Sequence, residues 1–176
     1  MSQELILVNE QDEQTGTGEK MMIHREGLLH RAFSIFIFNE NGQMLMQRRS
    51  LSKYHSGGLW TNACCSHPGP GEDLERSAHK RLQEEMGFST PLTKVFDFIY
   101  RAGFGNGMTE HEFDHVFVGE YDGPVLYNKD EVMDYCYQSM EEIRQSISFR
   151  PDAYTEWFKL AFPRVDNWWQ ERFKTN

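Results

Sequence analysis

The stretch Gly71-Glu-Asp-Leu-Glu-Arg-Ser-Ala-His-Lys-Arg-Leu-Gln-Glu-Glu-Met-Gly87 decides the fold class of this chain. Within it, apolar residues recur at every fourth position, namely Leu74, Ala78, Leu82 and Met86. Residues four apart lie on one face of an α-helix, so the pattern predicts a helix over residues 74–86 with a single buried stripe. Gly87 follows the last apolar residue, and glycine is the residue that most often ends a helix there.

Apolar runs before and after this helix predict strands. Residues 31–38, Arg-Ala-Phe-Ser-Ile-Phe-Ile-Phe, are apolar on both faces, which is typical of a central strand that is covered on each side. The sequence Asn-Glu-Asn-Gly at 39–42 predicts a turn into a partner strand over residues 43–48. Further strands are expected at residues 4–8, 95–101, 113–120 and 132–137.

The C-terminal part of the chain is predicted to be helical. Ser139 and Glu142 have the spacing of a capping box at a helix start. Two later helical segments, broken by Pro163, carry the tryptophans Trp157, Trp168 and Trp169. Because strands and helices interleave without the regular alternation of a parallel sheet, we expect an α/β (α+β) sandwich with a mixed sheet and additional C-terminal helices.

Composition limits the functions that this chain can have. The 176 residues contain no internal repeat or linker, so residues 1–176 are expected to form a single domain. A net charge of -9 argues against a general nucleic-acid binder, and no apolar run is long enough to span a bilayer. The three cysteines cannot form a disulfide framework, which favours the reducing cytoplasm. Nothing indicates a membrane partner or an obligate protein partner.

Two short segments carry residues that are suited to chemistry. Cys65 and His67 are two positions apart, as are Glu110 and Glu112. In extended backbone such pairs point to the same face of a strand. His24 and His30 precede the apolar 31–38 run. Together these segments offer three imidazoles, two carboxylates and one thiol.

The predicted helix and the residues before it resemble the Nudix box, a loop-helix-loop motif that holds a divalent metal against a diphosphate. The positions that match the motif are Glu72, Glu84, Glu85 and Gly87. Ser66 replaces the opening glycine, and Lys80-Arg81 replaces an Arg-Glu pair. The loss of that glutamate removes a metal carboxylate, which argues against ordinary Nudix hydrolysis. The resemblance implies a Nudix-type α/β/α sandwich.

Nearly the whole chain is similar to the type I isopentenyl-diphosphate:dimethylallyl-diphosphate isomerases, which are Nudix-fold enzymes of isoprenoid synthesis. The matching segments are residues 18–20, 29–34, 47–49, 60–68, 100–102, 109–112 and 130–135, with the aromatic C-terminal region. The resemblance implies an isomerase that moves a double bond by protonation and deprotonation through a tertiary carbocation. The alternatives are a Nudix pyrophosphohydrolase acting on a small diphosphate and a catalytically silent binding module.

The resemblance also implies a metal site. Its ligands would be His24, His30, His67, Glu110 and Glu112. Imidazole and carboxylate ligands suit Mn, Fe or Zn, and we expect Mn2+ or Zn2+. The remaining histidines, for which no role is expected, are His55, His79, His111 and His115.

By the same resemblance, Cys65 and Glu112 would transfer the two protons, assisted by Tyr100. Which group delivers the first proton is left open. Trp157 would lie over the carbocation; the alternative is simple packing with Tyr154, Phe158 and Ala161 on one helix face. Plain packing roles are expected for Cys64, Cys136, Trp168 and Trp169.

The substrate diphosphate would be bound by basic side chains and a second cation. The candidates are Lys20, Arg49, Lys53 and Arg81. Mg2+ would bridge the diphosphate to Glu85 and to the backbone carbonyl of Cys65. Arg81 and Glu85 are also four residues apart, so they are able to form an ordinary helix ion pair instead.

Overall fold

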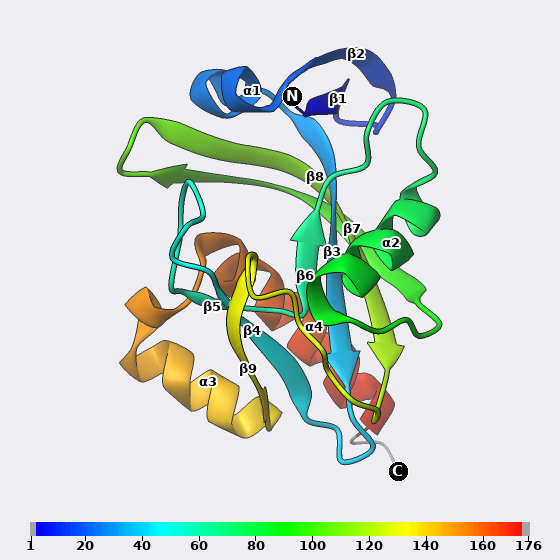
Figure 1. Cartoon of the computed structure of the whole chain (residues 1–176), viewed down its shortest axis with the longest axis vertical. Coiled ribbons are helices and arrows are strands. Elements are labelled where there is room, and N and C mark those ends of the chain that lie inside the picture. Colours follow the sequence, from blue (N-terminus) through cyan, green and yellow to red (C-terminus); the bar gives the residue numbers. More distant parts are fainter. Residues whose placement is uncertain (1–2, 174–176) are drawn as a thin grey trace.

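The computed structural model describes residues 3–173, and within them nine strands form one mixed sheet (Figure 1). The strands are β1 (Glu4–Val8), β2 (Gln14–Glu19), β3 (His30–Phe38), β4 (Met44–Arg49), β5 (Trp60–Thr61), β6 (Cys64–Ser66), β7 (Thr93–Phe104), β8 (Met108–Glu120) and β9 (Val132–Gln138). β3 runs antiparallel to β1, β4 and β6 and parallel to β8. The mixed sheet that the sequence predicts is therefore confirmed, with the apolar 31–38 run in the central strand.

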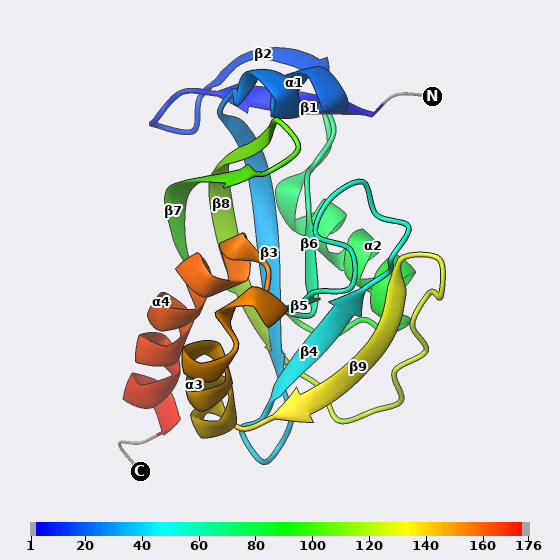
Figure 2. The ribbon, with the colours of Figure 1, turned by 90° about the vertical axis from the view of Figure 1, so that its left-hand side faces the viewer.

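Helices cover both faces of this sheet (Figure 2). The helices are α1 (Lys20–Glu26), α2 (Leu74–Met86), α3 (Met140–Phe149), α4 (Glu156–Phe173) and the 3-10 turn η1 (Pro151–Ala153). Alternate residues of β3 point to opposite sides. Phe33 and Ile35 pack with α2 in one core, which we call the α2-side core. Phe36 and Phe38 pack with α3 and α4 in a second, the α4-side core. The α/β/α sandwich is thus confirmed.

Helix α2 has the bounds that its sequence pattern predicts. The Asp73 side chain accepts a hydrogen bond from the backbone N–H of Arg76, and this caps the first turn. Ala78, Leu82 and Met86 are fully buried against the sheet. Gly87 ends the helix with a φ of 75°, in the left-handed region that glycine tolerates best.

We expect Gly87→Ala to lower the free energy of unfolding by about 2–4 kcal/mol. A Cβ at this position would lie 2.2 Å from the carbonyl oxygen of Leu126, and the backbone would also be strained. Gly71→Ala is the matched control, because Gly71 has a similar φ of +78° but no atom within 4 Å of the added Cβ. Urea unfolding of both variants measures the difference. Equal losses in the two variants would mean that the contact with Leu126 contributes nothing.

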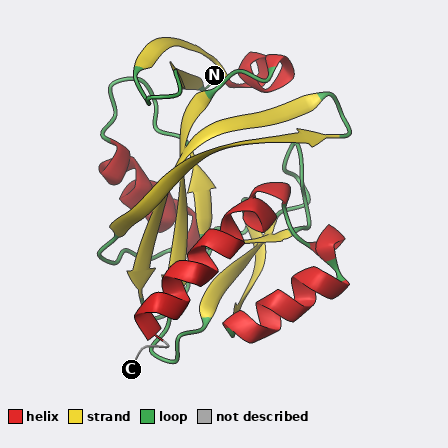
Figure 3. Ribbon diagram, turned by 180° about the vertical axis from the view of Figure 1, so that it is seen from behind, coloured by secondary structure: helices red, strands yellow, loops and turns green. Residues whose placement is uncertain are grey.

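The predicted break at Pro163 is wrong, because α4 continues through this residue (Figure 3). Proline removes one helical hydrogen bond and costs about 3 kcal/mol. The free energy gained by packing is larger than this cost. Helix α4 buries Phe158, Phe162 and Val165 in the α4-side core, and each contributes about 1.5–3 kcal/mol. Pro163 itself lies on the exposed face of the helix.

Other elements match or extend the predictions. Ser139 caps α3, where its hydroxyl accepts from the Glu142 N–H at 3.1 Å. The strand expected over residues 113–120 begins earlier, at Met108, because β7 pairs with β8 from Met108 to Val118. Four short elements lacked any predicted counterpart, namely β2, α1, β5 and η1. No helix among residues 3–173 is long and apolar enough to cross a membrane.

Candidate active site

A cavity of about 380 Å³ lies where α1, α2, β6, β7, β8 and the start of α4 approach one another. Most of the predicted site residues line it, namely Lys20, Arg49, Lys53, Cys65, His67, Arg81, Glu85, Tyr100, Glu110, Glu112 and Trp157. His24 and His30 are fully buried and contact the cavity wall through Glu110. The fold thus brings all of the predicted site residues together.

The pairing of three strands places the carboxylates. Glu110 and Glu112 lie on one face of β8, and β3 sets His30 directly opposite Glu112. On the other side of β8, Tyr100 of β7 is also the register partner of Glu112. Cys65 lies on β6, which pairs with β3 from the opposite edge. Consequently the thiol and Glu112 approach the cavity from strands on either side of β3.

Four side chains form a compact donor cluster. One ligand atom from each of His24, His30, His67 and Glu110 lies within 4.8 Å of the others. The His24 Nε2 is 2.7 Å from Glu110 Oε1, and the His67 Nε2 is 2.7 Å from Glu112 Oε2. The His30 Nε2 lies 3.5 Å from Glu110 Oε2 and 3.3 Å from Glu112 Oε2. Glu112 therefore joins the cluster through two imidazoles.

Backbone carbonyls set the tautomers of two of these histidines. The His24 Nδ1 lies 2.6 Å from the Lys20 carbonyl, and the His30 Nδ1 lies 2.9 Å from the Leu28 carbonyl. A carbonyl only accepts, so each Nδ1–H donates, which leaves each Nε2 as the ring atom that faces the carboxylates and would bind a metal. The His30 Nε2 and the Glu110 Oε2 are buried without a hydrogen-bond partner. A divalent cation between them satisfies all of these atoms at once.

The electrostatics of the cluster favour a positive charge. Burial lowers the pKa of His30, but the Glu110 and Glu112 carboxylates close to its Nε2 outweigh burial and raise the pKa to about 10. Burial raises the pKa of Glu110, yet its hydrogen bonds with imidazoles hold that pKa well below its usual range. The Glu110 carboxylate therefore remains ionised and is suited to metal coordination.

Cys65 lies among polar partners in the cavity wall. Its thiol donates to Asn62 Oδ1 at 3.1 Å and lies 3.4 Å from the Ser34 hydroxyl. Ser34 in turn donates to Asp114 Oδ2 at 2.7 Å. Burial, followed by the Asp114 charge, raises the pKa of Cys65 well above its ordinary value, so the group is a neutral thiol. A neutral thiol has a proton to give.

The other two cysteines have packing roles, as the sequence predicts. Cys64 is fully buried in the α2-side core. Cys136 is partly buried and packs against the α4-side core.

Tyr100 donates its phenolic hydrogen to Glu112. Burial, and next the Glu112 charge, raise the pKa of Tyr100 well above its ordinary value, so it remains a neutral donor. The hydrogen bond fixes one oxygen of Glu112, while His67 contacts the other. This carboxylate is held from two sides.

Trp157 does not pack as the plain packing alternative expects. Its indole belongs to a cluster with Tyr100 and Ala102, on the cavity side. The residues that were expected to share its face, Tyr154, Phe158 and Ala161, lie in the α4-side core instead. The Arg49 guanidinium carbon is 5.0 Å from the indole ring centre. Trp168 and Trp169 do pack against the α4-side core.

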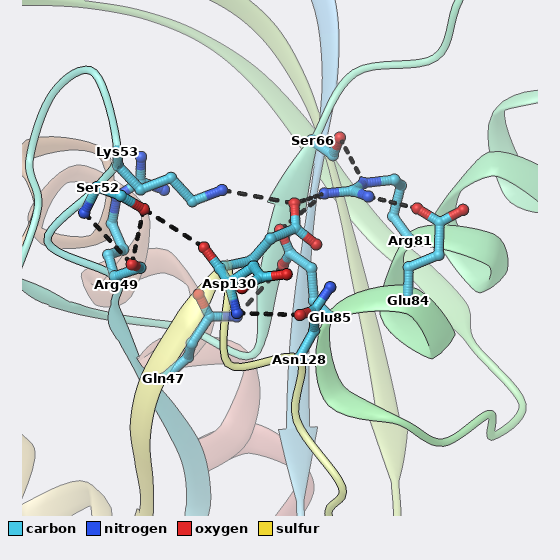
Figure 4. Close-up of polar contacts among 12 residues, drawn as sticks. Gln47, Arg49, Ser52, Lys53, Ser66, Arg81, Glu84, Glu85, Asn128 and Asp130 are labelled. Carbon is cyan, nitrogen blue, oxygen red and sulfur yellow. Dashed lines mark hydrogen bonds and ion pairs between the residues drawn. The ribbon is translucent and has the colours of Figure 1, made fainter.

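Figure 4 shows Arg49 and Lys53, from the end of β4 and the loop that follows it, facing Arg81 of α2 across a group of acidic side chains. Arg81 donates to Glu85 at 2.9 Å, to Glu131 at 2.8 Å and to the Ser66 hydroxyl at 3.2 Å. The Lys53 ammonium lies 3.5 Å from Glu131. The i,i+4 pair between Arg81 and Glu85 is confirmed, although the guanidinium also faces the cavity.

His55, for which the sequence suggested no role, also lies at the cavity. His55 is 7% exposed, lines the cavity, and places Nε2 3.3 Å from Glu110 Oε1. Burial lowers the pKa of His55, which keeps the ring neutral. The sequence held one sign of this position, because His55 lies two residues after Lys53, a predicted diphosphate-binding residue. Glu131 was also missed; it is the acidic partner that Lys53 and Arg81 share.

The remaining histidines lie outside the donor cluster. His111 contacts the Gly27 carbonyl at 3.1 Å, and His115 pairs with Asp12 at 2.9 Å. His79 is partly exposed on α2. For these three, the prediction of no ligand role agrees with their positions.

Comparison with known proteins shows which domain family the chain contains. Residues 28–158 match the NUDIX domain family model, which covers most of the chain. A solved structure from Deinococcus radiodurans superposes with a TM-score of 0.76 at 21% identity, covering 92% of this chain and 98% of that one. The MutT protein of Methanosarcina mazei superposes with a TM-score of 0.64 at 20% identity, covering 79% and 94%. At this identity the two structures support the fold alone.

Relatives with similar sequences show which family of Nudix-domain proteins the chain belongs to. Isopentenyl-diphosphate Delta-isomerase 2 of Photorhabdus laumondii is 48% identical, over 96% of this chain and 98% of that protein. Isopentenyl-diphosphate Delta-isomerase of Pectobacterium atrosepticum is also 48% identical, over 95% and 93%. The chain belongs to the isopentenyl-diphosphate Delta-isomerase family of Nudix-domain proteins.

Proposed function

We propose that this protein interconverts isopentenyl diphosphate and dimethylallyl diphosphate. The observation that carries the proposal is the placement of two proton-transfer groups, Cys65 and Glu112, at one cavity from either side of β3. The names of the relatives point to the same reaction. The double bond moves when a proton is added at the terminal carbon and another is lost from the carbon nearer the diphosphate.

The metal site in this proposal has three imidazoles and two carboxylates. Its ligands are His24, His30, His67, Glu110 and Glu112. Such ligands suit Mn2+ or Zn2+, which is the choice we propose. When bound, the ion would supply positive charge beside the Glu112 carboxylate. The tautomers set by the Lys20 and Leu28 carbonyls present the two buried Nε2 atoms for this purpose.

Proton transfer is assigned to Cys65 and Glu112, with Tyr100 assisting. The neutral thiol of Cys65 is able to donate, and the Glu112 carboxylate is able to accept. Tyr100 holds Glu112 by a hydrogen bond and so fixes the position of the oxygen that exchanges protons. Because the reaction is reversible, each group acts as acid in one direction and as base in the other. The tertiary carbocation forms between them.

Substrate binding is assigned to the basic side chains that line the cavity. They are Lys20, Arg49, Lys53 and Arg81. Arg81 and Lys53 already share Glu131, so the diphosphate would replace a carboxylate as their partner. Mg2+, bound with the diphosphate by Glu85 and the Cys65 carbonyl, would offset the repulsion between phosphate and Glu85.

Two further proposals concern the whole chain. Lys20 and His24 lie outside the matched residues 28–158 but contribute to the same cavity and cluster, which supports residues 1–176 acting as one domain. The three cysteines are free, which supports a cytoplasmic location. The small diphosphate substrate is the only partner that we propose.

The function is tested by incubating the purified protein with isopentenyl diphosphate in the presence of Mn2+ or Zn2+ and Mg2+. Formation of dimethylallyl diphosphate without phosphate release supports the isomerase. Release of phosphate or diphosphate without isomerisation would instead identify a hydrolase. Neither product, with a folded and metal-loaded protein, would contradict both.

We expect turnover to fall in the order Trp157, Trp157→Phe, Trp157→Leu. The indole faces the cavity beside Tyr100, and cation–π attraction to a desolvated carbocation is worth about 2 kcal/mol, or about 30-fold in rate. Phenylalanine keeps part of the π surface, whereas leucine keeps only bulk. Steady-state kinetics give the order, and binding of a tertiary ammonium analogue is expected to weaken in parallel. A folded Trp157→Leu with wild-type turnover and analogue affinity would refute the role.

A further inference from the structure

The loop between β4 and β5, residues 50–59, carries a buried histidine that belongs to no predicted ligand set. The ring of His55 is fixed by aromatic neighbours. It stacks on Phe104 with centroids 4.3 Å apart and planes 10° apart. Tyr54 and Trp157 meet it edge-on, at 4.3 Å and 5.6 Å. These contacts leave the imidazole little freedom to rotate.

The hydrogen-bonding partners of His55 determine what its two nitrogens do. Nδ1 lies 3.1 Å from the Ser56 hydroxyl, and Nε2 lies 3.3 Å from Glu110 Oε1. A carboxylate only accepts, so the contact with Glu110 requires the hydrogen on Nε2. The Ser56 hydroxyl then donates to Nδ1. In this tautomer His55 is a donor to Glu110 and has no lone pair directed at the cluster.

His55 therefore differs from the three histidines of the donor cluster. The mutually close ligand atoms come from His24, His30, His67 and Glu110, and His55 is not among them. It contacts the cluster through Glu110 Oε1, the oxygen that also contacts His24 at 2.7 Å. A group that donates to a ligating carboxylate fixes the orientation of that carboxylate.

The loop is itself anchored beside the cavity. Arg49 donates through its guanidinium to the His55 carbonyl at 3.3 Å. The backbone of Arg49 also closes the base of the loop, through hydrogen bonds with Gly58 and Leu59 at 2.9 Å each. The position of His55 is thus set by contacts within the fold.

We propose that His55 is a positioning residue for the metal site: its Nε2–H holds Glu110 so that the carboxylate faces His24 and His30. This inference rests on the proposed metal site and adds a residue to it. The physical gain is preorganisation, because Glu110 does not have to be immobilised when the ion binds. Tyr54, Phe104 and Trp157 contact the imidazole of His55 and hold it in place. Through His55, the cavity wall at Trp157 is therefore connected to the proposed metal site.

The test is the affinity of the metal-free protein for Zn2+ and for Mn2+, measured by competition with a chelating indicator. We expect His55→Ala to bind each ion about 10- to 100-fold more weakly than wild type. His55→Gln places an amide N–H near the position of Nε2 and is expected to restore affinity to within a few-fold. His55→Asn reaches only the position of Nδ1 and is expected to behave like alanine. His79→Ala, on the exposed part of α2, is the control and should not change affinity.

The outcomes separate this inference from the metal site itself. If His24→Ala loses the ion while His55→Ala binds it as wild type does, the metal site stands and the role of His55 is overturned. If His24→Ala also retains wild-type affinity, the metal site is wrong. Should alanine prevent folding, as judged by circular dichroism, the glutamine and asparagine variants still decide. Equal affinity in these two variants contradicts a hydrogen bond from Nε2.

Discussion

Cys65→Ala is expected to reduce isomerisation of isopentenyl diphosphate to background while leaving the metal content near that of wild type. In the proposed mechanism the thiol, which lines the cavity, is one of two proton-transfer groups, and such a group contributes up to about 10,000-fold in rate. Its side chain is absent from the donor cluster. Product analysis gives the turnover, and elemental analysis of the same sample gives the metal content.

Cys64→Ala is the matched control for this experiment. The two thiols are adjacent in the chain, but Cys64 points into the α2-side core and not into the cavity. We expect this variant to keep most of its turnover and to lose some stability, because it leaves a small void in a packed core. Near-wild-type isomerisation by Cys65→Ala would remove the thiol from the mechanism. Loss of metal in that variant would mean instead that Cys65 organises the cluster.

The parts of the fold that the sequence predicts well are those with a strong local pattern. The apolar stripe of α2 and the apolar run of β3 correspond to elements with nearly the predicted bounds. β2 has no such pattern, since Gln14–Glu19 contains two glycines and no large apolar residue. It is extended because it pairs with β1 along its length. That pairing is a tertiary effect that a local pattern does not contain.

Pro163 and His55 show the same limit in different ways. The rule that proline ends a helix is a local one, and packing of α4 against the sheet outweighs it. The sequence around His55 gives no helix or strand pattern, so its side chain has no predictable direction. Only the folded loop brings it to Glu110, which is distant in the chain. By contrast, Glu110 and Glu112 were predictable as a pair because alternate residues of a strand share a face.

The members of the candidate site could be named from the sequence through their family resemblance, whereas their arrangement could not. The parallel pairing of β3 with β8 sets His30 beside Glu112, across a long segment of chain. The carbonyls of Lys20 and Leu28, which orient two imidazoles, are backbone atoms that any residue possesses. Residue identity therefore carries no information about them. These contacts come from the turn geometry of α1 and the residues that follow it.

His67→Ala and Glu110→Gln are expected to lower both the bound transition metal and the turnover, with metal affinity reduced by more than about 100-fold. A lost ligand should cost more than the 10- to 100-fold typical of residues that only orient ligands. Glu110 is the stronger case, because its carboxylate contacts His24, His30 and His55. Glutamine keeps the shape but removes the negative charge, and it directs an amide N–H at nitrogens or at the ion.

Equilibrium dialysis against Mn2+ or Zn2+, followed by elemental analysis, measures the effect in both ligand variants. His79→Ala is the control, since this partly exposed residue of α2 lies outside the donor cluster. Thermal unfolding of each protein with and without metal separates loss of the site from loss of the fold. Added metal should raise the unfolding temperature of wild type more than that of either variant. Unchanged stoichiometry and affinity in both ligand variants would place the metal elsewhere in the protein. Retained metal with lost turnover in Glu110→Gln alone would assign Glu110 to the chemistry and not to the ligand set.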